Sequence, residues 1–97
     1  MAATLQRIEV AKKAAELINP IAQRIMEKWG MTFAQIQETG KEAEFDREII
    51  RLIKEDPKTN SIFEKSKAYT KDNFGIAWEA FSEDQKNIIA LKETKLW

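Results

Sequence analysis

The sequence predicts an all-α fold, namely a compact single-domain bundle or orthogonal array of about five to seven short helices without a sheet. Along most of the chain, apolar residues recur at spacings of three and four, which is the period of a helix. β-Branched residues do not alternate at period two over a useful length, and no Asn-Gly or Asp-Gly pair joins two apolar runs. The three glycines and two prolines fall where helices are expected to begin or end.

The chain is expected to form one helical domain over residues 1–97, with a modest core. Apolar residues make up 43% and charged residues 33% of the sequence, and the formal net charge is zero, so the composition is unlike that of a disordered chain. Cysteine and histidine are both absent, which removes the usual zinc ligands and the commonest general base at neutral pH. The sequence therefore predicts a protein that is not an enzyme and that holds no cofactor and no metal.

The first helix is predicted from about Thr4 to Ile18. Asn19 followed by Pro20 is typical of an N-cap and a first helical position, which predicts a second helix that runs to Trp29. The apolar stripe stays almost in phase across Pro20, however. One long helix bent at Pro20 is therefore the alternative.

Two glycines frame a short helix in the middle of the chain. Gly30 is expected to end the preceding helix in the left-handed conformation. Thr32 and Gln35 form a capping-box pattern that opens the short helix, and Gly40 ends it. A longer amphipathic helix is predicted over about residues 41–55, and Pro57 stops it. Its apolar face consists of Phe45, Ile49, Leu52 and Ile53.

Two further capping-box patterns predict where the helices in the last third begin. These patterns are Ser61–Glu64 and Ser82–Gln85. Between them, the apolar residues of Phe74–Phe81 follow a helical spacing that Gly75 weakens. The last helix is expected to end near Thr94.

The absence of any catalytic or cofactor motif, together with more apolar side chains than a small core needs, predicts a non-enzymatic binding or regulatory module. From its short, charge-rich and helical composition, we expect a small accessory protein of a bacterium or a phage. The module is expected to act through protein–protein contact, with another protein or with a second copy of itself as a homo-oligomer. The predicted contact residues are the C-terminal pair Leu96 and Trp97 and four acidic residues, Glu38, Glu42, Glu44 and Glu48.

Each of these two contact surfaces has a second interpretation. Trp29 and Trp78 are in phase with apolar stripes and are expected in the core, whereas the terminal pair ends the chain. The terminal pair is therefore expected either to fold back on the core or to insert into a partner. The acidic residues are alternatively a solvated face, in which Glu48 lies within reach of Arg51.

Nucleic-acid binding is the alternative function. It would use a lysine-rich surface over residues 58–71, because lysines grip phosphates and aromatic rings stack on bases. Glu64 and Asp72 dilute the charge of this segment, and Tyr69 also fits an apolar stripe. The lysines concerned are Lys58, Lys65, Lys67 and Lys71.

A cytoplasmic location is expected. No apolar run approaches the roughly 18 residues of a membrane span, so no membrane partner is predicted. Charged residues such as Arg7 and Glu9 interrupt the N-terminal stretch, which is unlike a signal peptide.

Overall fold

The computed structural model describes residues 2–94, with side chains from residue 8 onward. Over these residues it contains five α-helices, one 3₁₀ helix and no strand, which confirms the predicted all-α fold. No helix within residues 2–94 has the length and apolar character that a membrane span requires. The helices are α1 (Ala2–Trp29), α2 (Phe33–Glu38), α3 (Glu42–Glu55), α4 (Pro57–Phe74), the 3₁₀ helix η1 (Gly75–Ala80) and α5 (Glu83–Thr94).

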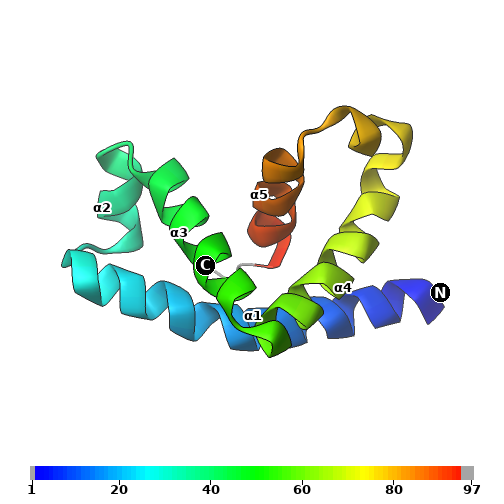
Figure 1. The fold of residues 1–97 in the computed structure, drawn as a ribbon, viewed down its shortest axis with the longest axis horizontal. Helices are drawn as coiled ribbons and strands as arrows, with labels where there is room; N and C mark the ends of the chain where they lie inside the picture. The colour runs from blue at the N-terminus through cyan, green and yellow to red at the C-terminus, as the bar shows by residue number, and fades with distance from the viewer. Residues whose placement is uncertain (1, 95–97) are drawn as a thin grey trace.

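The long helix α1 forms one edge of the molecule, and the shorter helices rise from it (Figure 1). From the corner at Asp56, α3 and α4 diverge, and α5 lies between them (Figure 1). The short α2 lies beside α3, next to the C-terminal end of α1 (Figure 1). This arrangement places α2 and η1 at opposite ends of the molecule.

Pro20 lies inside α1, so the predicted break at Asn19 is wrong and the alternative of one long helix is confirmed. A proline lacks the N–H that would bond to the carbonyl of Glu16, and this normally destabilises a helix. Tertiary packing compensates here, because Ile18 and Ile21 are buried on either side of Pro20 in the same core. The proline ring itself is exposed.

Both predicted features around α2 are confirmed. Gly30 has a φ of 65°, and the N–H groups of Gly30 and Met31 bond to carbonyls of the last turn of α1. The Thr32 hydroxyl accepts a hydrogen bond from the Gln35 N–H, and the Gln35 side chain accepts one from the Thr32 N–H. The same reciprocal pair, between Ser82 and Gln85, opens α5.

The start predicted for α4 at Ser61 is wrong, because α4 begins four residues earlier at Pro57. Asp56 provides the cap instead: its carboxylate accepts hydrogen bonds from the Lys58 N–H at 3.0 Å and the Thr59 hydroxyl at 3.2 Å. Pro57 then occupies the first helical position, where a missing N–H costs nothing. Pro57 therefore ends α3 as predicted and also starts α4.

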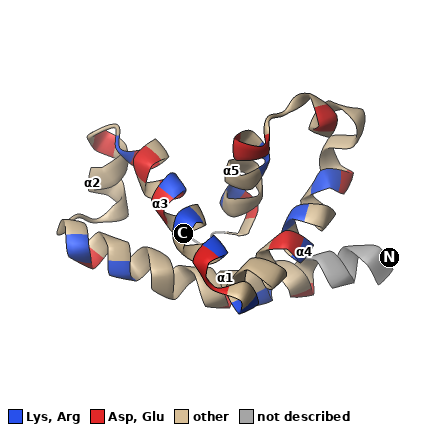
Figure 2. Cartoon of the chain, viewed as in Figure 1, with Lys and Arg blue, Asp and Glu red and all other residues tan. Residues whose placement is uncertain are grey.

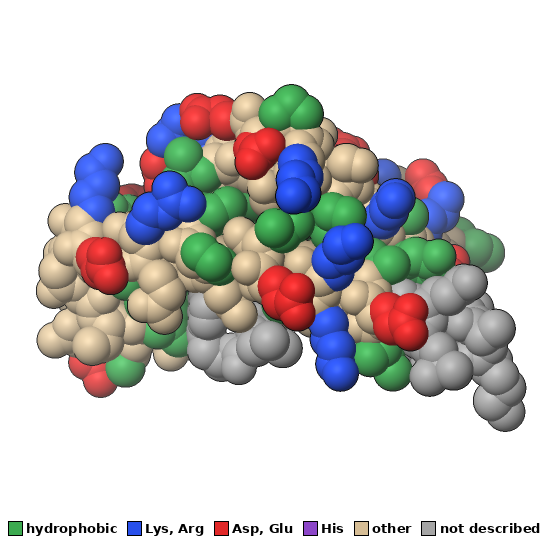
Figure 3. Space-filling view, turned by 90° about the horizontal axis from the view of Figure 1, so that it is seen from below, with side chains coloured by type: hydrophobic (Ala, Val, Ile, Leu, Met, Phe, Trp, Pro, Cys, Tyr) green, Lys and Arg blue, Asp and Glu red, His purple; other side chains and the backbone are tan. Residues whose placement is uncertain are grey.

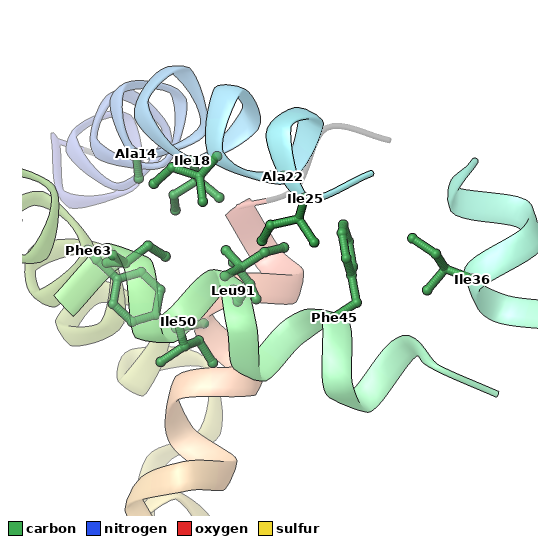
Figure 4. Packing of buried hydrophobic residues seen from close by; sticks show 13 residues of the cluster. Ala14, Ile18, Ala22, Ile25, Ile36, Phe45, Ile50, Phe63 and Leu91 are labelled. Carbon is green, nitrogen blue, oxygen red and sulfur yellow. The ribbon is translucent and has the colours of Figure 1, made fainter. Parts of the chain in front are cut away.

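One apolar cluster joins the five α-helices (Figure 4). Phe45 of α3 and Phe63 of α4 are its fully buried aromatic residues. Trp29 is half-buried at its edge, and Trp78 is buried elsewhere, against Phe74 and Phe81. The buried members of the cluster are Ala14, Ile18, Ile21, Ala22, Ile25, Ile36, Phe45, Ile49, Ile50, Ile53, Phe63, Ala90 and Leu91.

The segment Phe74–Phe81 was predicted as an α-helical stripe, but most of it forms the 3₁₀ helix η1. Gly75, at a φ of 55°, ends α4 and lets the chain turn. The rings of Phe74, Trp78 and Phe81 then pack together with centroids 5.7–6.3 Å apart. The tighter 3₁₀ geometry gathers these rings within the short connection between α4 and α5.

Candidate functional site

A groove of about 560 Å³ lies where α1 ends and α2 begins. Its apolar side chains are those of Met26, Met31 and Phe33, all of them half-buried. Gln23, Glu27, Gly30, Thr32 and Gln35 complete the lining. An open surface of this kind fits an apolar side chain of a partner.

Local sequence signals position the groove. Gly30 ends α1 and Thr32 caps α2, so Met31 alone connects the two caps. The Met31 N–H bonds to the Met26 carbonyl at 3.1 Å, which holds the connection against the last turn of α1. One lining residue, Phe33, packs against the core: its ring centroid lies 6.0 Å from that of the buried Phe45, which lies 5.8 Å from that of Trp29.

The polar side chains of the groove lining are those of Gln23, Glu27, Thr32 and Gln35. The Thr32 hydroxyl and the Gln35 side chain are engaged in the capping box. Glu27 is the charged residue in the lining. Within the described part of the chain, no group of three or more Asp or Glu residues is arranged to hold a metal ion.

The four acidic residues of the predicted contact surface do not form one face. Glu38 ends α2 and Glu42 starts α3. Glu44 and Glu48 lie one turn apart on α3. At about 100° per residue, Glu44 points roughly 160° and Glu48 roughly 120° away from Glu42 around the helix axis. Glu44 lines a depression of about 360 Å³ with Trp29, Met31 and Lys41, so it borders the groove residue Met31.

Glu48 is engaged within its own helix. Its carboxylate accepts two hydrogen bonds from the Arg51 guanidinium, which also pairs with Glu55. The hydrogen bonding and charge of Arg51, with a smaller contribution from Lys28, lower the pKa of the Glu48 carboxyl. The predicted reach between Glu48 and Arg51 is thus confirmed, and this acidic residue is partly neutralised.

The four lysines of the predicted nucleic-acid surface divide between two faces of α4. Lys58 and Lys65 are exposed, lie two turns apart, and form no ion pair within residues 8–94. Lys67 and Lys71 lie on the far side, where Lys67 pairs with Glu64 and Glu83. Lys71 lies 3.5 Å from the carboxylate of Glu79. The predicted cluster is therefore reduced to two unpaired lysines.

Charges of both signs are mixed over the surface. Both α3 and α4 carry basic as well as acidic residues (Figure 2). The face that α1 presents also carries lysine and arginine side chains interspersed with aspartate and glutamate (Figure 3). Phosphate binding is favoured by a basic face, and mixed charge of this kind does not supply one.

A second apolar surface lies at the opposite end of the molecule, in η1. Ile76 is 94% exposed there, next to the Phe74, Trp78 and Phe81 cluster. Lys86 lies over the Trp78 ring at 5.9 Å and also near Glu79. The exposed apolar residue here is Ile76, whereas the apolar residues between α1 and α2 line a groove.

The structure adds a candidate site that the sequence analysis did not predict. The terminal pair Leu96 and Trp97 lies outside the described residues, so its role stays a prediction. The groove residues Met26, Met31 and Phe33 were not predicted as a contact surface. The available signal was Met31, an apolar residue placed between a helix-ending glycine and a helix-capping threonine.

Comparisons with known proteins identify no relative, so the function is inferred from the fold and the groove. Protein-family models, curated proteins and solved structures were compared with the chain, and none of them matches it.

Proposed function

We propose that this protein is a non-enzymatic binding module that acts through protein–protein contact, and that the groove between α1 and α2 receives apolar side chains of the partner. The observation that carries the proposal is that the half-buried side chains of Met26, Met31 and Phe33 line one recess together. Such side chains lose contact with water when a partner covers them, which favours association.

The composition of the groove supports an adaptable contact. Methionine side chains are flexible and polarisable, and they fit apolar groups of several shapes. The packing of Phe33 on Phe45 limits the cost of ordering the site on binding. An apolar side chain that is fully buried by such a contact contributes roughly 1.5–3 kcal/mol.

The chain offers a direct reporter, because Met26 and Met31 are two of its three methionines. We would label the methionine methyl groups with ¹³C and titrate a helical peptide that carries leucines at i, i+4 and i+7. Binding in the groove should shift the methyl resonances of Met26 and Met31 at peptide concentrations below about 1 mM. A dilution series of the protein without peptide tests whether a second copy of the chain occupies the groove, because the same Met26 and Met31 methyl resonances would then shift.

A matched pair of variants separates groove binding from non-specific contact. Met31→Asp places a charge in the groove and should abolish the peptide-induced shift of Met26. Ala34→Asp places the same charge at an exposed position of α2 outside the groove lining and should leave the shift unchanged. Methyl resonances that stay unshifted up to about 1 mM peptide, and that do not change on dilution, would overturn the proposal.

A further inference from the structure

Most of the oxidisable sulfur of this chain lies in the groove between α1 and α2. Met26 and Met31 line the groove, and they are two of the three methionines in the sequence. The sequence contains no cysteine, so the methionine thioethers are its only sulfur groups. An oxidant that attacks sulfur therefore has two of its three targets in one recess.

Both side chains are open to a small oxidant. Met26 and Met31 are half-buried, and the recess that they line has a volume of about 560 Å³. They pack against the core cluster from outside and do not belong to its buried members. Hydrogen peroxide should therefore reach the two sulfur atoms without any separation of the helices.

Oxidation of these sulfur atoms would change the chemistry of the recess. A methionine sulfoxide is polar, whereas the thioether from which it forms is apolar. The apolar side chains of the lining are those of Met26, Met31 and Phe33, so two of the three would become polar. An apolar partner that covered these sulfoxides would remove them from water without offering a hydrogen bond, which is unfavourable.

We infer that Met26 and Met31 form a peroxide-sensitive modification site, and that their oxidation to sulfoxides prevents apolar partners from binding in the groove. The effect on binding rests on the proposed function, whereas the modification itself does not. In the reaction, a lone pair of the sulfur attacks one oxygen of hydrogen peroxide, and the S–O bond forms as the O–O bond breaks. The departing hydroxide takes the proton of the transferred oxygen and becomes water. The sulfur loses two electrons, and hydrogen peroxide gains them.

The fold around the site does not depend on the two sulfur atoms. The Met31 N–H bonds to the Met26 carbonyl at 3.1 Å, and the Thr32 hydroxyl caps α2. These contacts involve the main chain and the cap, so they remain when a thioether is oxidised. The modified protein should therefore keep its helical circular dichroism signal. Methionine sulfoxide reductases can reverse the modification, so the site is suited to regulation.

The first experiment tests the modification without any partner. The folded protein is treated with hydrogen peroxide, and mass spectrometry of proteolytic fragments follows each methionine. Met26 and Met31 should each gain one oxygen atom, at a rate similar to that of free methionine in the same solution. If either residue is oxidised only after unfolding in urea, its sulfur is shielded, and the inferred modification site is wrong whether or not the groove binds a partner.

The second experiment tests the effect on binding. Fluorescence anisotropy of a labelled, leucine-bearing helical peptide without methionine measures its affinity before and after peroxide treatment. Oxidation should weaken binding by at least about fivefold. The control is the double variant Met26→Leu and Met31→Leu, because leucine keeps an apolar side chain of similar volume that peroxide does not oxidise. Its affinity for the peptide should be unchanged by the treatment.

The outcomes separate the inference from the proposed function. If the untreated protein does not bind the peptide, the proposed function falls, and the effect on binding falls with it. If oxidised and untreated protein bind the peptide equally well, the groove is a binding site but oxidation does not control it. A loss of the helical signal on oxidation would show that the methionines maintain the fold, which would also overturn the inference.

Discussion

Lys67 shows how the tertiary structure changes the meaning of a single residue. The sequence groups it with three other lysines as a phosphate-binding candidate. In the fold its side chain is only 12% exposed, and its ammonium donates hydrogen bonds to Glu83 and to Asn87 of α5. The residue therefore links α4 to α5.

The first prediction concerns the stability that Lys67 provides. Lys67→Ala should lower the free energy of unfolding by about 1–2 kcal/mol, because the buried Asn87 loses its hydrogen-bond donor. The exposed Lys65→Ala should change it by less than about 0.5 kcal/mol. Urea unfolding of both variants measures the difference, and equal losses would contradict a structural role for Lys67.

The second prediction concerns acid. The hydrogen bond and charge of Lys67 lower the pKa of the Glu83 carboxyl in the folded protein. A lowered folded-state pKa gives stability that is present above the ordinary glutamate pKa and is lost as pH falls through the lowered value. Stability should therefore fall on acidification from pH 7 to about pH 3, and it should fall less in Lys67→Ala. If the Lys67→Ala variant loses as much stability on acidification as the parent protein, the pair of Lys67 and Glu83 does not contribute.

At the scale of the elements, α1 is the clearest case of packing that overrides a local signal. Pro20 leaves the carbonyl of Glu16 without its helical N–H partner, yet the helix continues. Ile18, Ile21 and Ile25 face the same core on both sides of the proline. Sequence rules that treat each helix cap and each helix-breaking residue separately do not include the free energy of packing between helices.

The third prediction concerns the hydrogen bond that Pro20 removes from α1. Pro20→Ala should stabilise the fold by about 1–3 kcal/mol, because it restores a helical hydrogen bond and the proline ring is exposed. Gln23→Ala is the control, because Gln23 is exposed and its backbone N–H is present in both forms. This change should alter stability by a few tenths of a kcal/mol. Thermal and urea unfolding measure both. Destabilisation by Pro20→Ala would mean that the packing of α1 depends on the bend that a proline imposes.

The joint at Asp56 and Pro57 gives a second lesson at this scale. The sequence marks Pro57 as a helix stop, and that is confirmed. The same proline is also a helix start, because Asp56 before it accepts two hydrogen bonds from the first turn of α4. Two helices that share one residue between them leave no room for a loop, so the chain turns sharply there (Figure 1).

At the scale of the molecule, the two apolar surfaces that the structure exposes lie far apart. Met26, Met31 and Phe33 line the groove between α1 and α2, whereas the exposed Ile76 belongs to η1. The helices α2 and η1 lie at opposite ends of the molecule (Figure 1). The terminal pair Leu96 and Trp97 is a further apolar segment of the sequence. Removing that pair tests whether it belongs to a contact surface.

The fourth prediction is that deletion of Leu96 and Trp97 weakens association with a partner or with a second copy, while the helical circular dichroism signal is kept. The reason is that, within residues 8–94, all five α-helices already contribute buried residues to the core cluster. Sedimentation velocity over a concentration range measures the self-association. A collapse of the helical signal would show instead that the pair completes the core.

The sequence by itself determined the all-α class, two of the three capping boxes and the apolar face of α3, because these depend on spacing along one helix. Only the tertiary structure decided that α1 continues through Pro20, since burial on both sides outweighs one missing hydrogen bond. It also decided the charge pairing of Lys67 and Lys71 and the groove between α1 and α2. Those features join residues from different helices or from a chain turn, and periodicity within one segment carries no information about which helices meet.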